Sequence, residues 1–68
     1  MQTLDFTVTG MTCQHCVASV TEEVTELPGV TEVDVDLDSG RLHVVGDVTA
    51  EQVRAAVAEA GDYTAQPA

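Results

Sequence analysis

The sequence predicts a small α+β domain whose strands and helices follow the order βαββαβ. One observation is that four short segments alternate or concentrate apolar residues as strands do. A second is that two longer segments repeat apolar residues every three or four positions, as amphipathic helices do. A third is that turn-forming residues separate these segments, at Pro28-Gly29, Asp38-Ser39-Gly40 and Gly61. The 68 residues leave room for one domain, residues 1–68.

The first half of the chain contains a strand, a loop and a helix. Residues 3–9 alternate in polarity, so we expect a half-buried strand. Its apolar face consists of Leu4, Phe6 and Val8. A loop at 10–13 leads to a helix over about 14–27, which Pro28-Gly29 ends. The inward stripe of this helix consists of Val17, Val20, Val24 and Leu27.

The second half contains two strands, a helix and a short last strand. A strand over about 30–37 turns at Asp38-Ser39-Gly40 into a strand over 41–46. Thr49 and Gln52 have the spacing of a capping box, so a second helix begins there and ends at Gly61. The apolar positions of these three elements are Val33, Val35, Leu37, Leu42, Val44, Val53, Ala56, Val57 and Ala60. We expect a short last strand around Tyr63 and Thr64, followed by a loose tail at 66–68.

This element order predicts a ferredoxin-like sandwich. Each βαβ crossover should be right-handed, which places both helices on one face of a four-stranded antiparallel sheet. The other face of the sheet should be solvated, because it carries Thr, Asp and Glu. The loop at 10–13 should then lie at one edge of the domain, near the segment that carries Tyr63.

Charge and hydropathy exclude several classes of partner. Twelve carboxylates and two arginines give a formal charge of −10, so nucleic acid and anionic lipid are unsuitable ligands, and a basic protein surface is favoured. No segment approaches the roughly 20 apolar residues of a membrane span. The residues after Met1 resemble no signal peptide, so we expect a cytoplasmic protein whose thiols stay reduced.

Both cysteines lie where the first strand gives way to the first helix. Cys13 and Cys16 are separated by two residues. A helix N-terminus favours thiolate over thiol, and two neighbouring thiolates suit a soft metal ion or thiol–disulfide chemistry.

Three kinds of site could use such a pair. A thiol–disulfide oxidoreductase is disfavoured, because a thioredoxin-like domain needs more chain than this one has. Structural zinc needs about four ligands, and His43 falls in the outward phase of its strand. A soft, low-coordinate d¹⁰ ion held by two thiolates fits best. Paired carboxylates or a nucleophile–base arrangement are not visible in the sequence, so we expect no enzyme.

The segment Gly10-Met11-Thr12-Cys13-Gln14-His15-Cys16 resembles the GMTCxxC motif of heavy-metal-associated domains. Its Cys-x-His-Cys core is similar to that of bacterial copper chaperones of the CopZ type. The resemblance implies Cu(I) binding by Cys13 and Cys16, and delivery by ligand exchange to the metal-binding domain of a copper-transporting P-type ATPase. A copper buffer or sensor-feeding protein that forms a Cu(I)-bridged homodimer is the alternative.

The resemblance also assigns roles to the neighbours of the cysteines. Met11 is expected to point into the core and anchor the loop. His15 would modulate the thiolates or act as a weak ligand. Thr12 stands where zinc- or cadmium-specific relatives tend to have a carboxylate, which favours Cu(I).

Tyr63 corresponds to a tyrosine that lies near the metal loop in such chaperones, where it would modulate the thiolates or act as a weak ligand. They often have Gly-Tyr after the second helix, whereas this chain has Asp62 between Gly61 and Tyr63. The inserted residue predicts a displacement of Tyr63 from the loop.

Overall fold

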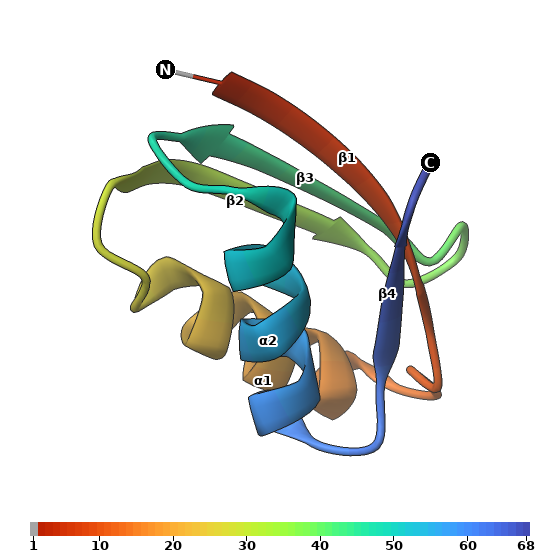
Figure 1. Ribbon diagram of the computed structural model, residues 1–68. Coiled ribbons are helices and arrows are strands. Elements are labelled where there is room, and N and C mark those ends of the chain that lie inside the picture. Colours follow the sequence, from red (N-terminus) through yellow and green to blue (C-terminus); the bar gives the residue numbers. More distant parts are fainter. Residues whose placement is uncertain (1) are drawn as a thin grey trace.

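One antiparallel sheet with two helices on one of its faces makes up the part of the chain that the computed structural model describes, residues 2–68 (Figure 1). The elements are β1 (Gln2–Thr9), α1 (Gln14–Thr25), β2 (Val30–Asp36), β3 (Arg41–Gly46), α2 (Ala50–Ala60) and β4 (Thr64–Pro67). The strand order across the sheet is β2-β3-β1-β4. The predicted ferredoxin-like βαββαβ sandwich is therefore confirmed. Within these residues, neither helix is long and apolar enough to cross a bilayer.

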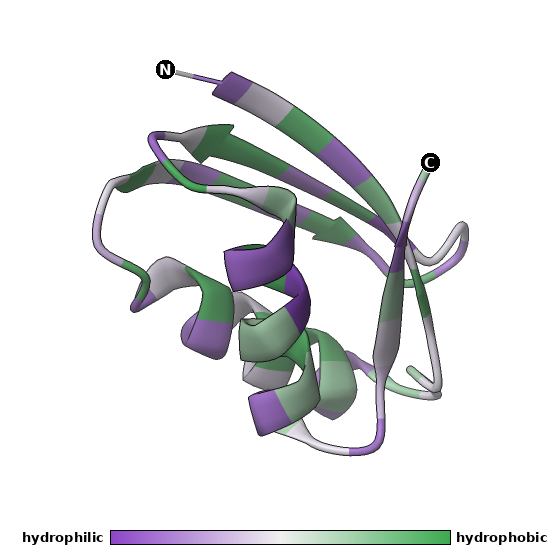
Figure 2. Cartoon of the chain, in the orientation of Figure 1, coloured by the Kyte–Doolittle hydropathy of each residue, from purple (hydrophilic) through white to green (hydrophobic). Residues whose placement is uncertain are grey.

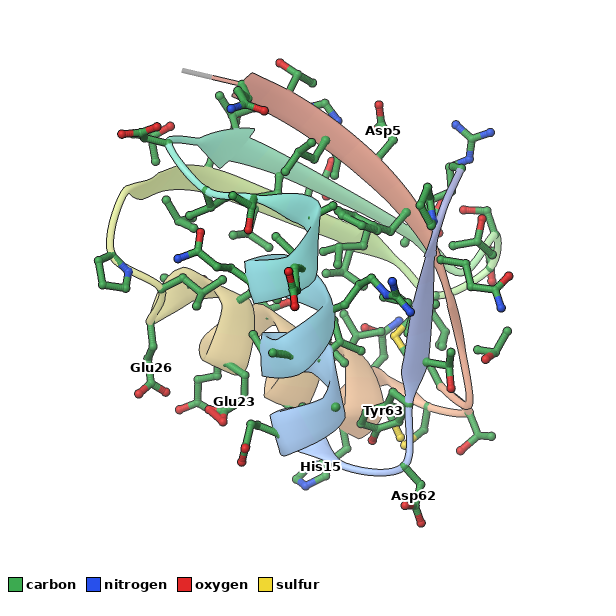
Figure 3. All side chains as sticks on the ribbon, viewed as in Figure 1. Asp5, His15, Glu23, Glu26, Asp62 and Tyr63 are labelled. Carbon is green, nitrogen blue, oxygen red and sulfur yellow. The ribbon has the colours of Figure 1, made fainter. Side chains whose placement is uncertain are left out.

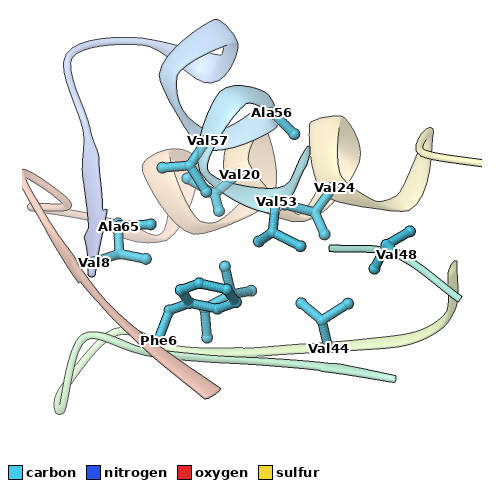
Figure 4. Packing of buried hydrophobic residues seen from close by; sticks show 11 residues of the cluster. Phe6, Val8, Val20, Val24, Val44, Val48, Val53, Ala56, Val57 and Ala65 are labelled. Atoms are coloured by element: carbon cyan, nitrogen blue, oxygen red, sulfur yellow. The ribbon is translucent and has the colours of Figure 1, made fainter. Parts of the chain in front are cut away.

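The core lies between the helices and the sheet. Because polar and apolar residues alternate along β1, Phe6 and Val8 point toward the helices and are buried. The hydropathy colouring shows this alternation as bands along the strand (Figure 2). Phe6 rises from the sheet side of the cluster and faces valines of the helices (Figure 4). The buried residues are Phe6, Val8, Val20, Val24, Leu42, Val44, Val48, Val53, Ala56, Val57 and Ala65. Nearly every member is small or β-branched, so the core is thin and close-packed.

The strand register aligns charged residues on the open face of the sheet. β1 pairs with β3 so that Asp5 lies opposite His43, and β3 pairs with β2 so that His43 lies opposite Asp34. His43 Nδ1 lies 2.7 Å from Asp5 Oδ1. The solvated face predicted from the Thr, Asp and Glu positions is therefore present.

Helix α1 ends two residues earlier than expected. Its last helical residue is Thr25, and Leu27 N donates instead to Val24 O at 3.1 Å, a tighter turn. Leu27 still packs against the core, but it is only partly buried, as is Val17. Leu37 lies in the turn beyond β2. Helix α1 therefore contributes fewer fully buried residues than the periodicity predicted.

The last strand extends further than the sequence predicts. Residues 66–68 were expected to form a loose tail, but β4 continues to Pro67, which lies opposite Phe6 of β1. Ala68 N donates to Asp5 O at 3.0 Å. Proline is tolerated here because β4 is an edge strand, where a missing N–H on the outer side breaks no ladder bond. This pairing buries Ala65 against the helices.

Candidate metal-binding site

The loop between β1 and α1 brings the two thiols together. Cys13 is the N-cap residue of α1, and Cys16 lies in its first turn. The carbonyl of Cys13 accepts hydrogen bonds from the backbone N–H groups of Cys16 (3.0 Å) and Val17 (3.3 Å), which fixes the turn. The two Sγ atoms are 3.6 Å apart. Cys13 is exposed and Cys16 is partly buried, so a metal ion on the pair would remain accessible from the Cys13 side.

The surroundings of Cys16 favour its ionised form. A hydrogen bond from the backbone of Thr12, followed by side-chain hydrogen bonds from Tyr63 and Cys13, lowers its pKa from 9.0 to about 6. The Thr12 hydroxyl also lies 3.9 Å from Cys16 Sγ. At neutral pH the Cys16 sulfur is therefore largely a thiolate, the form that binds soft metals.

The start of α1 is left open to an anion. Within the described chain, the Cys13 side chain makes no capping hydrogen bond, and the first turn of α1 contains no acidic residue. This is notable in a chain with twelve carboxylates. The free N–H groups and the positive end of the helix dipole are thus available to the two sulfurs.

Tyr63 lies beside the thiols despite the inserted residue. Tyr63 N donates to Gly61 O at 2.8 Å, and this tight three-residue turn accommodates Asp62 and directs its side chain away from the domain (Figure 3). The Tyr63 pKa is raised, first because its hydroxyl donates to Cys16 and then because of burial. The expected displacement of Tyr63 is therefore not observed.

Gly10 and Gly61 make room for this arrangement. Gly10 has φ +102°, and a Cβ there would lie 2.6 Å from Asp62 O and 3.2 Å from the Tyr63 ring. A Cβ on Gly61 would lie 3.0 Å from the same ring. A side chain at Gly10 would push the Tyr63 segment away from the loop, and one at Gly61 would crowd the Tyr63 ring.

Of the remaining predicted residues, Met11 and His15 lie at the thiol end of the domain, and His43 does not. Met11 is partly buried and packs against the core, as expected of a loop anchor. His15 is exposed at the same end of the domain as the thiols (Figure 3). His43 lies on the open face of the sheet with Asp5, away from the loop.

Thr12 contributes more to the site than the metal selectivity expected of it, because its backbone and its hydroxyl both contact Cys16. The four-residue spacing between Thr12 and Cys16 is the sequence signal for this contact. No group of three or more His, Cys, Asp or Glu side chains among residues 2–68 is arranged to hold a metal ion. The geometry therefore describes a two-sulfur site, suited to an ion that accepts low coordination.

The comparisons with known proteins agree with this fold and motif. Residues 5–62 match the model of the heavy-metal-associated domain, and the chain belongs to that family. It is 42% identical over 60 residues to a COP-associated protein of Helicobacter felis, covering 85% of this chain and 91% of the relative. It is 39% identical over 64 residues to the copper chaperone CopZ of Staphylococcus saprophyticus, covering 90% and 94%.

A solved structure extends the likeness to a transporter domain. The copper-binding domain of HMA7, a P-type ATPase, superposes with a TM-score of 0.94 at 32% identity, covering 100% of this chain and 95% of that domain. The same fold thus occurs in a copper-binding domain of a P-type ATPase.

Proposed function

We propose that this protein is a copper chaperone that holds Cu(I) between the thiolates of Cys13 and Cys16. The observation that carries the proposal is the pair of sulfurs, 3.6 Å apart at an uncapped helix start, with one of them exposed. Thiolates prefer Cu(I) to hard cations. The names of the relatives, a copper chaperone and a copper-binding domain, support copper as the cargo.

Transfer would proceed by exchange of ligands. A thiolate of the acceptor approaches the metal on the exposed Cys13 side and forms a third Cu–S bond. The Cu–S bond to one donor thiolate then breaks, without any change in the copper oxidation state. Cys13 is the sulfur we expect to leave first, because Cys16 is more enclosed and has Thr12 and Tyr63 to stabilise its negative charge.

The acceptor we propose is the metal-binding domain of a copper-transporting P-type ATPase. The support is the close structural likeness between this chain and the HMA7 domain, since two sites of similar geometry can exchange an ion with little free-energy difference. The protein would thus be a carrier and not an enzyme. We place the exchange in the cytoplasm, where thiols remain reduced.

The roles of the neighbouring side chains follow from their positions. Met11 would anchor the loop from the core side. His15 would modulate the thiolates from the exposed side, or bind weakly to a metal shared between two molecules. Tyr63 would stabilise Cys16 through its hydroxyl.

The test is an anaerobic transfer experiment. Cu(I)-loaded protein is mixed with the purified metal-binding domain of a copper-transporting ATPase, and the two are separated and assayed for copper. We expect copper on both proteins within minutes. Retention of all copper, together with dimerisation in sedimentation runs when Cu(I) is added, would instead indicate a storage protein. Reduction of insulin disulfides by the copper-free protein would indicate an oxidoreductase.

A further inference from the structure

The two helices differ in how well their own residues support a helix. Five of the twelve residues of α1 are β-branched and lose rotamer freedom in a helix, namely Val17, Val20, Thr21, Val24 and Thr25. Five of the eleven residues of α2 are alanine, which favours a helix most, namely Ala50, Ala55, Ala56, Ala58 and Ala60. Local preference therefore stabilises α2 more than α1.

Hydroxyl groups along α1 weaken that helix further. Ser19, Thr21 and Thr25 each donate a side-chain hydrogen bond to the carbonyl four residues earlier, at 3.2, 2.8 and 2.6 Å. Such bonds give a helix carbonyl a second donor, and they slightly destabilise and bend the helix. Helix α2 contains no serine or threonine.

The charges of α1 oppose its dipole at the C-terminal end. Glu22, Glu23 and Glu26 lie in or directly after the last turn, which contains no basic residue. Negative charge at this end repels the partial negative charge of the free carbonyl groups. The first turn of α1 has no acidic residue to compensate, whereas the first turn of α2 has Glu51 in addition to its capping box.

The glutamates at this end also repel one another. Glu23 and Glu26 project next to each other from α1 (Figure 3). Burial, followed by the proximity of Glu26, Glu59 and Glu22, raises the pKa of Glu23. Among residues 2–68, the one ion pair lies on the open face of the sheet, so no cation of this part of the chain pairs with these glutamates.

Helix α1 also contributes little to the buried core. Of the eleven buried hydrophobic residues in the described chain, two belong to α1, Val20 and Val24. The others come from α2, from three of the strands and from the segment before α2. The sheet and α2 would therefore keep most of their packing if α1 detached.

We propose that α1 opens as a unit while α2 and the sheet remain folded, and that a metal ion bound to Cys13 and Cys16 holds it closed. Two thiolates around a monovalent ion carry one net negative charge, which is the sign that the start of α1 lacks. Opening would separate the two sulfurs, which the first turn holds 3.6 Å apart, so the ion must leave before the helix opens. The closing role of the ion rests on the proposed function, whereas the opening of the copper-free helix does not.

Native-state hydrogen exchange of the copper-free protein, followed by NMR, tests the opening. The amides of Val20 and Val24 in α1 are compared with that of Val57 in α2, because all three side chains are fully buried. We expect protection factors about tenfold lower for the two α1 amides, which should share one opening free energy. Equal protection in the two helices would overturn the proposal.

Two double variants of equal charge show whether the acidic end of α1 controls the opening. Glu22→Gln/Glu26→Gln removes two charges from that end, and Asp34→Asn/Asp36→Asn removes two from the open face of the sheet. We expect the helix variant to raise the protection of the two α1 amides about fivefold, as for two charges at a helix end. The sheet variant should change it less than about twofold. Equal changes in both variants would overturn the proposal.

The same exchange measurement on Cu(I)-loaded protein tests the role of the ion. Cu(I) should raise the protection of Val24, at the end of α1 away from the thiols, by at least about tenfold. An unchanged Val24 would mean that the helix frays from its acidic end without involving the site, and would overturn the proposal. A parent protein that binds no Cu(I) would contradict the proposed function and with it the role of the ion, while exchange in the copper-free protein would still decide whether α1 opens.

Discussion

The two helices of this domain begin in opposite ways. At the start of α2, Thr49 and Gln52 form a complete capping box, with Gln52 N donating to Thr49 Oγ1 at 3.2 Å and Thr49 N donating to Gln52 Oε1 at 2.9 Å. At the start of α1, the cap residue is Cys13, and within residues 2–68 its side chain makes no capping hydrogen bond. One helix start is closed by its own side chains, and the other is left open beside two sulfurs.

Within this one small fold, the capped start of α2 contributes to stability, whereas the uncapped start of α1 is kept for the thiol site. A chain of this size buries only about 60% of its unfolded surface, so each capping interaction matters to its stability. The open start of α1 gives up that stabilisation and leaves its N–H groups and dipole to the thiolates.

The largest expected effect is on the ionisation of Cys16. In the folded protein its pKa is about 6, compared with an ordinary value of 9.0. The rate of alkylation of Cys16 by iodoacetamide, followed by peptide mass spectrometry, should therefore rise with a midpoint near pH 6. In urea the midpoint should move up to the ordinary value of 9.0. Because the folded pKa is depressed, Cys16 stabilises the fold above its unfolded pKa, and this contribution is lost as the pH falls through about 6.

Tyr63→Phe provides the matched control for that measurement. The variant keeps the ring against Gly10 and Gly61 but removes the hydroxyl, so the pKa of Cys16 should rise while the fold is retained. The account of the site would be wrong if the folded and urea-unfolded proteins gave the same midpoint.

The next effect is on the closed helix start. Thr49→Ala removes the side-chain acceptor of the capping box and should lower the free energy of unfolding by about 1 kcal/mol. Urea denaturation measures the loss, and Thr49→Ser is the control that should keep most of the cap. Cu(I) affinity should not change, because Thr49 belongs to the other helix. A change in affinity would mean that the two helix starts are coupled.

At the open helix start we expect a smaller change in the free energy of unfolding, and in this case an increase. Serine is a better N-cap than cysteine, so Cys13→Ser should raise the free energy of unfolding of the copper-free protein by roughly 0.5 kcal/mol. The same variant should lose one of the two copper ligands. Urea denaturation and Cu(I) titration of one preparation measure both effects. A destabilised variant would contradict the view that this end is left uncapped for the metal.

The smallest effect is expected on the open face of the sheet. The hydrogen bond to the Asp5 carboxylate raises the pKa of His43. The negative charges of Asp5, Glu32 and Asp34 also raise this pKa, by smaller amounts. The pair therefore stabilises the fold below the unfolded pKa of the histidine, and this contribution is lost as the pH rises through the folded pKa. Asp5→Asn should lower the His43 pKa in an NMR titration, and Asp34→Asn should lower it less. Equal shifts would show that the hydrogen bond is unimportant.

The sequence predicted those features that depend on local pattern. Alternation at Phe6 and Val8, the spacing of Thr49 and Gln52, and the position of both cysteines were sufficient for the fold and the site. Low strand propensity hid only the second part of the last strand, because Ala65, Gln66 and Pro67 are held by pairing with β1 and not by their own preferences.

The position of Tyr63 could not be predicted for a different reason. Counting residues suggested that Asp62 would displace the ring, but a single backbone turn from Gly61 to Tyr63 accommodates the extra residue. This turn packs closely against Gly10, which is distant in the sequence, so no local pattern reports the arrangement. Crowding of the carboxylates on two separate helices was hidden for the same reason.

The central claim, that two thiolates at the open start of α1 bind Cu(I), is tested most directly by anaerobic competition with a copper chelator of known affinity. The parent protein should withdraw one Cu(I) per molecule from the chelator, and the Cys13→Ser/Cys16→Ser variant should withdraw none while remaining folded. A double variant that competes as well as the parent, or a reduced parent that does not compete, would contradict the account.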